Sequence, residues 1–93
     1  MAPEKAAGEE LSMRLRRLRY RAWHRGTREM DLILGPYADA RLPVMGPAEL
    51  DRFEALLEKM DTDLLDWLTG SVPTPPDADR DLLADLLAFK TAQ

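Results

Sequence analysis

The most informative segment of the sequence reads His24-Arg25-Gly26-Thr27-Arg28-Glu29-Met30-Asp31-Leu32-Ile33-Leu34. It joins a basic segment to an apolar segment, both with helical spacing, and one glycine separates the two. Glycine adopts a positive φ without steric cost, and it allows another backbone to approach closely. We therefore expect two helices to meet at Gly26, in a docking corner that Arg25, Arg28 and Glu29 frame.

Apolar residues continue at helical spacing on both sides of this corner. Before it, the positions with spacings of four, three and four are Leu11, Leu15, Leu18 and Ala22. They predict a helix over residues 11 to 24 with Ser12 as its cap, whereas residues 1 to 10 lack periodicity and are predicted to form a flexible N-terminal tail. After the corner, a second helix is predicted over residues 27 to 41, and Pro36 is expected to kink or shorten it. Its apolar face consists of Met30, Ile33, Leu34 and Tyr37.

Three more helices are predicted downstream. Pro47 suits the first position of a third helix, Asp61 or Thr62 can cap a fourth that Gly70 ends, and Asp77 or Asp79 can start a fifth. The inward positions expected on these helices are Leu50, Phe53, Leu57, Met60, Leu64, Leu65, Trp67, Leu68, Leu82, Leu83, Leu86 and Leu87. The proline-rich residues 71 to 76 form an extended linker. The sequence thus predicts an all-α, compact five-helix bundle with a single helical domain over residues 11 to 93.

Length and composition argue against several classes of protein. A chain of 93 residues can bury one core but not a core and a deep catalytic cavity, so we do not expect an enzyme and predict no catalytic residue. The chain has no cysteine and a single histidine, His24, so no metal site is predicted. No apolar stretch approaches the roughly 18 residues of a membrane span, so no membrane insertion is expected. A bacterial, cytoplasmic protein is the expectation from these features.

Charge is unevenly distributed along the chain. Residues 1 to 28 contain eight Lys or Arg and three Glu, whereas residues 29 to 93 contain five Lys or Arg and fourteen Asp or Glu. This asymmetry predicts a basic patch on an acidic body. Arginine suits bidentate contact with carboxylates or phosphates, which leaves open an arginine-rich regulatory or nucleic-acid-binding, antitoxin-like protein. The acidic body and the pI of about 4.9 argue against nucleic acid.

The corner carries a family resemblance. Arg25-Gly26-x-x-Glu29 is similar to the RGxxE motif of the small succinate dehydrogenase assembly factors, called SdhE in bacteria and Sdh5 or assembly factor 2 in mitochondria. Downstream, Asp63-Leu64-Leu65-Asp66-Trp67-Leu68 resembles the D-L-x-x-W-L segment of that family. Together the similar segments extend over about residues 12 to 90. Thr27-Arg28 replaces a more apolar pair inside the motif, and Gly35 before Pro36 is a second departure from the family pattern.

The resemblance implies an FAD assembly factor that binds the flavoprotein subunit of succinate dehydrogenase and promotes its covalent flavinylation. In this interpretation the FAD belongs to the partner flavoprotein, where it is attached covalently to a histidine, and this chain binds no cofactor. Fumarate reductase is a second candidate partner, nucleic acid is not expected, and the chain is expected to be a monomer. The predicted partner-binding residues are Arg21, Trp23, Arg25, Gly26, Arg28, Glu29 and Asp31. On the residues alone, Gly26 could instead be a plain helix terminator, and Arg25 and Glu29 a weak surface ion pair.

Overall fold

The computed structural model describes the backbone of residues 2 to 92 and the side chains of residues 10 to 92. This part of the chain contains five α-helices and one short 3-10 helix and no strand. The elements are α1 (Ala2–Trp23), α2 (Arg28–Arg41), η1 (Leu42–Val44), α3 (Pro47–Leu57), α4 (Asp61–Thr69) and α5 (Arg80–Ala92). The predicted all-α class and the five helices are therefore confirmed.

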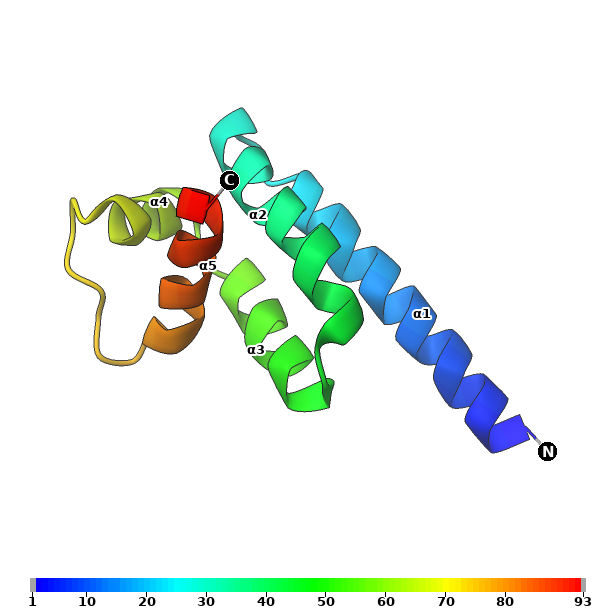
Figure 1. Cartoon of the computed structure of the whole chain (residues 1–93). Coiled ribbons are helices and arrows are strands. Elements are labelled where there is room, and N and C mark those ends of the chain that lie inside the picture. Colours follow the sequence, from blue (N-terminus) through cyan, green and yellow to red (C-terminus); the bar gives the residue numbers. More distant parts are fainter. Residues whose placement is uncertain (1, 93) are drawn as a thin grey trace.

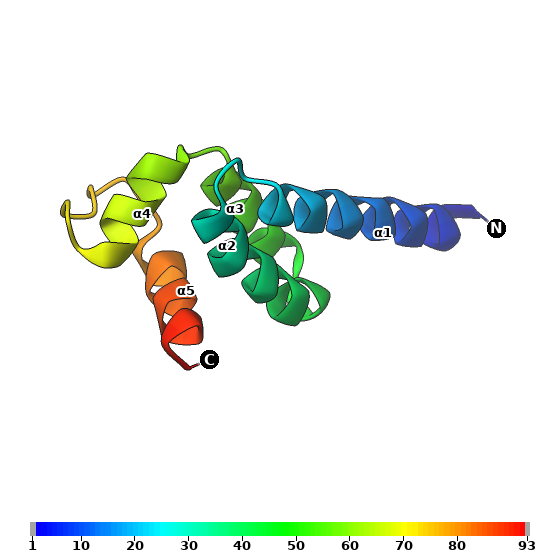
Figure 2. The ribbon, with the colours of Figure 1, turned by 90° about the horizontal axis from the view of Figure 1, so that it is seen from above.

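Helix α2 packs against α1 on one side and α5 on the other (Figure 1). Helix α1 leads up to the corner, and α2 returns alongside it (Figure 1). Helix α3 lies below α2 in this view, and α4 and α5 lie on the side of α2 that faces away from α1. In Figure 2 the N-terminal half of α1 extends beyond the other helices. This projection makes the molecule elongated, with principal extents of 52 × 27 × 23 Å.

One apolar core joins all five helices. The largest fully buried side chains are Tyr37, Phe53, Leu18, Met30, Leu34, Leu50, Leu64 and Leu86. The ring of Tyr37 stacks on Phe53 with a centroid separation of 5.9 Å and meets Phe89 edge-on at 5.5 Å. Burying each such side chain stabilises the fold by about 1.5 to 3 kcal/mol. Trp67, which the pattern places inward, is half-buried and packs against this core from α4.

Polar caps set several helix boundaries where the sequence predicts them. The Thr27 hydroxyl accepts a hydrogen bond from the Met30 amide at 3.3 Å, and the Asp79 carboxylate accepts one from the Leu82 amide at 3.1 Å. Each bond satisfies an amide in a first helical turn that has no partner within its helix. Gly70 ends α4 with a φ of +79°. The predicted end of α2 at Arg41 is also confirmed.

The predicted start of α1 is wrong. The helix begins at Ala2, so the segment of residues 2 to 10 is helical and Ser12 lies inside the helix, where it cannot act as the cap. Apolar periodicity detects only a helical face that packs, and the early part of α1 projects from the bundle, where Leu11 is exposed. Met1 and the side chains of residues 1 to 9 lie outside the described part, so the flexibility of this tail stays a prediction.

Two residues predicted to point inward are exposed. Helix α3 ends at Leu57, so Met60 no longer follows its spacing and instead precedes α4 as the N-cap residue. Leu87 lies at the edge of an apolar face of α5 that is buried at Leu82, Leu83 and Leu86. That face is narrower than the leucine pattern suggests.

Candidate docking corner

The corner between α1 and α2 is an open turn around Gly26. Its φ of +108° lies in a region that side chains rarely adopt. A Cβ added to Gly26 would meet only the Asp61 Oδ2 atom, at 3.9 Å. Glycine is therefore required here by the backbone conformation, and the surface above it is uncrowded.

The Asp31 carboxylate stabilises the turn by a hydrogen bond across it. Its Oδ1 atom accepts a hydrogen bond from the backbone amide of Arg25 at 2.6 Å, across the turn. The side chain is half-buried and lies in the first turn of α2, where the helix dipole favours a negative charge. This contact fixes the direction in which α2 leaves the turn. Asp31 thus shapes the corner, and its carboxylate is engaged within the chain.

The Arg25 side chain clamps the corner to the junction of α3 and α4. Its Nε donates to Asp61 Oδ1 at 2.8 Å, and its two terminal nitrogens donate to the carbonyl oxygens of Leu57 and Lys59, each at 2.6 Å. The Arg25 and Asp61 side chains are only 10% and 16% exposed. The alternative of a surface pair between Arg25 and Glu29 is wrong, because Arg25 lies in the connecting turn and not on the helix that carries Glu29.

Arg28 and Glu29 are the free charged groups of the corner. Both lie in the first turn of α2 and are exposed. Neither forms an ion pair or a side-chain hydrogen bond within the described residues, in contrast to Arg25 and Asp31. A bound protein could therefore pair with both groups without first breaking a contact in this chain.

Arginines of α1 pair with carboxylates on α3 and at its C-cap residue, Glu58. Arg14 contacts Asp51 at 2.7 Å and Glu54 at 3.0 Å, and Arg21 contacts Glu58 at 2.7 Å. The predicted basic patch is consequently smaller than the sequence suggests, because basic α1 lies along acidic α3. Arg21, predicted to bind a partner, has its guanidinium engaged here.

Trp23 packs inside the chain. A Cβ on Gly35 would overlap the Trp23 ring, so the glycine allows the indole to lie directly on α2. The Trp23 Nε1 atom donates to Asp39 at 3.2 Å, and Arg19 pairs with the same carboxylate. The Arg19 guanidinium, followed by the indole N–H, holds the pKa of the Asp39 carboxyl below its usual value. Trp23, predicted as an interface anchor, is half-buried in this contact.

Gly35 is the residue whose role sequence reasoning missed. In the sequence it stands out only as a departure from the family pattern. The signal available in the sequence was a glycine inside a helix, on an element predicted to lie beside the one that carries a tryptophan.

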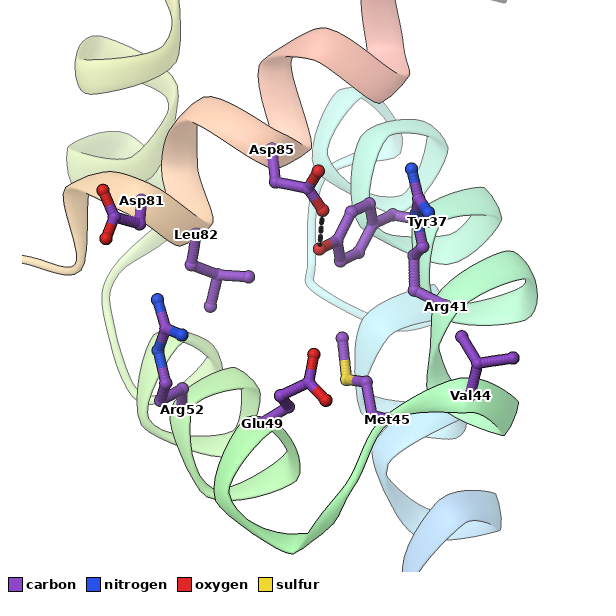
Figure 3. Close-up of a pocket in the computed structure, with 9 residues that line it drawn as sticks. All are labelled: Tyr37, Arg41, Val44, Met45, Glu49, Arg52, Asp81, Leu82 and Asp85. Carbon is purple, nitrogen blue, oxygen red and sulfur yellow. Dashed lines mark hydrogen bonds between the residues drawn. The ribbon is translucent and has the colours of Figure 1, made fainter.

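A separate hollow of about 360 Å³ lies between the α2 to α3 connection and α5 (Figure 3). At its edge the buried Tyr37 hydroxyl donates to Asp85 Oδ2 at 2.6 Å, and desolvation raises the pKa of Tyr37 above its usual range. Across the described residues, no buried side-chain nitrogen or oxygen lacks a partner. The described part also shows no group of three acidic or histidine side chains that could hold a metal. The hollow therefore offers no unsatisfied buried group to a ligand.

The fold and the corner define a class: a small helical domain with an open surface around a glycine of positive φ. None of the helices over residues 2 to 92 is long and apolar enough to cross a membrane. The family model described as "Flavinator of succinate dehydrogenase" matches residues 16–90. The chain belongs to this family, and the resemblance stated from the sequence is confirmed.

Curated relatives support the same assignment. The chain is 44% identical over 69 residues to the FAD assembly factor SdhE of Acetobacter pasteurianus, covering 74% of this chain and 63% of the relative. It is 35% identical over 80 residues to the mitochondrial succinate dehydrogenase assembly factor 2 of Saccharomyces cerevisiae, covering 86% and 49%. The Candida glabrata protein of the same name is 36% identical over 78 residues, covering 84% and 51%. The chain thus spans about half to two thirds of the length of these relatives.

Proposed function

We propose that this chain is an FAD assembly factor that binds the flavoprotein subunit of succinate dehydrogenase and promotes the covalent attachment of its FAD. The observation that carries the proposal is the family match over residues 16–90, which includes the whole corner and α2 to α4. The names of the relatives support it. Fumarate reductase is proposed as a second partner, and the chain as a monomer in the bacterial cytoplasm.

Different roles are proposed for the predicted partner-binding residues, according to whether each side chain is exposed or engaged within the chain. Gly26, Arg28 and Glu29 are open and are proposed to touch the flavoprotein subunit. Arg25 and Asp31 are engaged within the chain and are proposed to hold the corner in shape.

Supporting roles are proposed for the two predicted partner-binding residues on α1. Arg21 and Trp23 fix α1 on α3 and α2, so their proposed effect on binding is indirect. The factor acts by stabilising a state of the partner in which flavin attachment proceeds, because a ligand shifts an equilibrium by its differential affinity for the two states.

The FAD is proposed to sit on the partner and not on this chain. A dinucleotide site of the Rossmann type needs a glycine-rich turn after a strand, and residues 2 to 92 contain no strand. The exposed arginines could attract the pyrophosphate only weakly at physiological salt. Isothermal calorimetry of the purified chain with FAD should show little binding. Tight, stoichiometric binding would replace the docking model with a flavin-carrier model.

The function is tested by mixing the chain with apo flavoprotein subunit and FAD, then measuring covalent flavin by fluorescence on a denaturing gel. We expect more covalent flavin than in the mixture without the chain. The flavoprotein subunit of fumarate reductase, tested in parallel, addresses the second partner. Unchanged covalent flavin with succinate dehydrogenase flavoprotein would remove the proposed function.

The ion pairs of the N-terminal arginines argue against the nucleic-acid alternative. Arg14, Arg19, Arg21 and Arg25 each contact a carboxylate of this chain, which leaves few N-terminal guanidinium groups for phosphates. A titration with random duplex DNA should show no binding near physiological salt. Micromolar binding that weakens steeply with added salt would favour the alternative.

A further inference from the structure

A shallow hollow lies beside the Gly26 corner and is formed by two segments distant in sequence. Helix α1 and the turn after it contribute one wall, and the start of α4 contributes the other. The lining residues are Tyr20, Arg21, His24, Arg25, Met60, Asp61 and Thr62.

One wall of this hollow is a prearranged aromatic surface. The Tyr20 and His24 rings stack with a centroid separation of 3.9 Å and an interplanar angle of 15°. The His24 Nδ1 atom lies 2.8 Å from the Tyr20 carbonyl oxygen, so a protonated Nδ1 donates to it and fixes the imidazole ring. Tyr20 is nevertheless 63% exposed. A fixed, exposed aromatic pair loses little side-chain entropy when a partner covers it.

The opposite wall offers an exposed methionine, and the charges at the rim are already neutralised. Met60 is 67% exposed at the start of α4. Arg25 pairs with Asp61, and Arg21 pairs with Glu58. The hollow therefore presents aromatic and thioether surface without a free charge, which suits an apolar or aromatic side chain better than an anion.

The hollow is continuous with the docking corner. Asp61 lines it, and the Asp61 Oδ2 atom is also the nearest atom to the position of a Cβ on Gly26. Arg25 lines it as well and precedes Gly26 in the chain. A protein that sits on Gly26 would therefore cover the hollow. Interfaces of this kind concentrate binding energy in a few buried aromatic contacts near their centre.

We propose that Tyr20, His24 and Met60 form an anchor pocket that receives one apolar or aromatic side chain of the flavoprotein subunit. This inference rests on the proposed function, because the occupant is that same partner docked on the corner. It adds Tyr20, His24 and Met60, none of which is among the partner-binding residues predicted from the sequence.

The test measures the Kd for purified apo flavoprotein subunit of succinate dehydrogenase with single variants of the full chain. Tyr20→Ala and Met60→Ala should each weaken binding by about tenfold or more, as loss of an interface anchor does. Tyr20→Phe should bind within about twofold of wild type, because the ring and not the hydroxyl forms the wall. The matched control is Val44→Ala, which removes an apolar side chain that is 76% exposed on η1, at the other end of α2 from the corner. It should also stay within about twofold.

The outcomes separate this inference from the function on which it rests. If wild type binds and both alanine variants bind within about twofold of it, the anchor pocket is refuted while the assembly function stands. An equal loss in Val44→Ala would also refute it, because the effect would not be local. No binding by wild type would refute the assembly function itself. Circular dichroism checks that each variant is folded, and Met60→Lys, which alters a residue outside α1, provides a second probe should Tyr20→Ala unfold.

Discussion

Two glycines, Gly26 just before α2 and Gly35 in the middle of that helix, are present for opposite reasons. At Gly26 the backbone has a positive φ and the space for a side chain is open. At Gly35 the backbone is ordinary helix and the space is filled by the indole of Trp23. Gly26 is required by its backbone conformation and leaves the surface above it open. Gly35 is required because the Trp23 ring occupies the place of a side chain, and we call this packing of Trp23 on Gly35 the closed contact.

Residue type alone does not distinguish a glycine required by its backbone conformation from a glycine required by a packed neighbour. Both lie within ten positions of each other, in a segment that the family motif includes in part. What separates them is the neighbour: Gly26 faces only Asp61, and Gly35 faces a tryptophan from another helix. Bulky substitutions at the open corner should therefore act on partner binding as well as on stability. Those at the closed contact, and at the clamp behind the corner, should act mainly on stability.

The largest effect on stability is expected at the clamp. Arg25→Ala leaves the nearly buried Asp61 carboxylate without its partner and removes two hydrogen bonds to carbonyl oxygens, so it should lower the free energy of unfolding by about 3 kcal/mol. The measurement is urea denaturation followed by circular dichroism. Arg28→Ala is the matched control and should change stability by less than about 0.5 kcal/mol, since its guanidinium is exposed. Equal stability of the two variants would show that Arg25 is a surface group after all.

The closed contact comes next. Gly35→Val should lower the free energy of unfolding by about 2 kcal/mol, because the added methyl groups displace the Trp23 ring from α2. The same substitution in a Trp23→Ala background should cost much less, because the ring is then absent. A double-mutant cycle from urea denaturation isolates this coupling. If Gly35→Val lowers the free energy of unfolding equally in both backgrounds, the Trp23 ring is not the reason for a glycine at position 35.

The open corner should respond differently. Gly26→Ala and Gly26→Arg should each lower stability by about 1 to 2 kcal/mol, because both place a side chain at a positive φ. Only the arginine should abolish binding to apo flavoprotein subunit, since its bulk covers the surface that the alanine leaves nearly open. Surface plasmon resonance with both folded variants makes the comparison. If Gly26→Arg binds as well as Gly26→Ala, the corner is a helix terminator and not a docking site.

Most of the fold was predictable because local signals agreed with tertiary packing. Thr27, Gly70 and Asp79 act through hydrogen bonds or backbone angles within a few residues of themselves, so the sequence shows them directly. The start of α1 was not predictable from periodicity, because a helix that projects from the bundle needs no apolar face. The predicted burial of Met60 and Leu87 is wrong because burial depends on which neighbour covers a helix, and the spacing pattern contains no such information.

The candidate site was predictable in position but not in the roles of its residues. The motif identified residues 25 to 31, yet Arg25 bonds with the α3 to α4 junction about 32 to 36 positions away, which no local pattern indicates. The same holds for the contact of Trp23 with Gly35. Long-range contacts decide whether an arginine or a tryptophan is available to a partner.

The smallest effect concerns the polar edge of the closed contact. Asp39 accepts a hydrogen bond from the Trp23 indole and pairs with Arg19, and these contacts lower its pKa in the folded state. A carboxylate with a lowered folded pKa stabilises the fold above its unfolded pKa of about 3.9, and this contribution is lost as the pH falls through the lower folded value. Asp39→Asn should therefore lower stability by only about 0.5 kcal/mol at pH 7, because the pair is partly exposed.

This difference between Asp39→Asn and wild type should shrink as the pH falls below about 3.9, since wild type then loses the same charge. Urea denaturation at a series of pH values measures it. Asp77→Asn, which changes an exposed carboxylate in the loop before α5, is the matched control. A difference for Asp39→Asn that stays constant down to the lowest pH would mean that the ionised carboxylate does not hold Trp23 in place. The indole would then be fixed by its packing on Gly35 alone, and the closed contact would be an apolar one throughout.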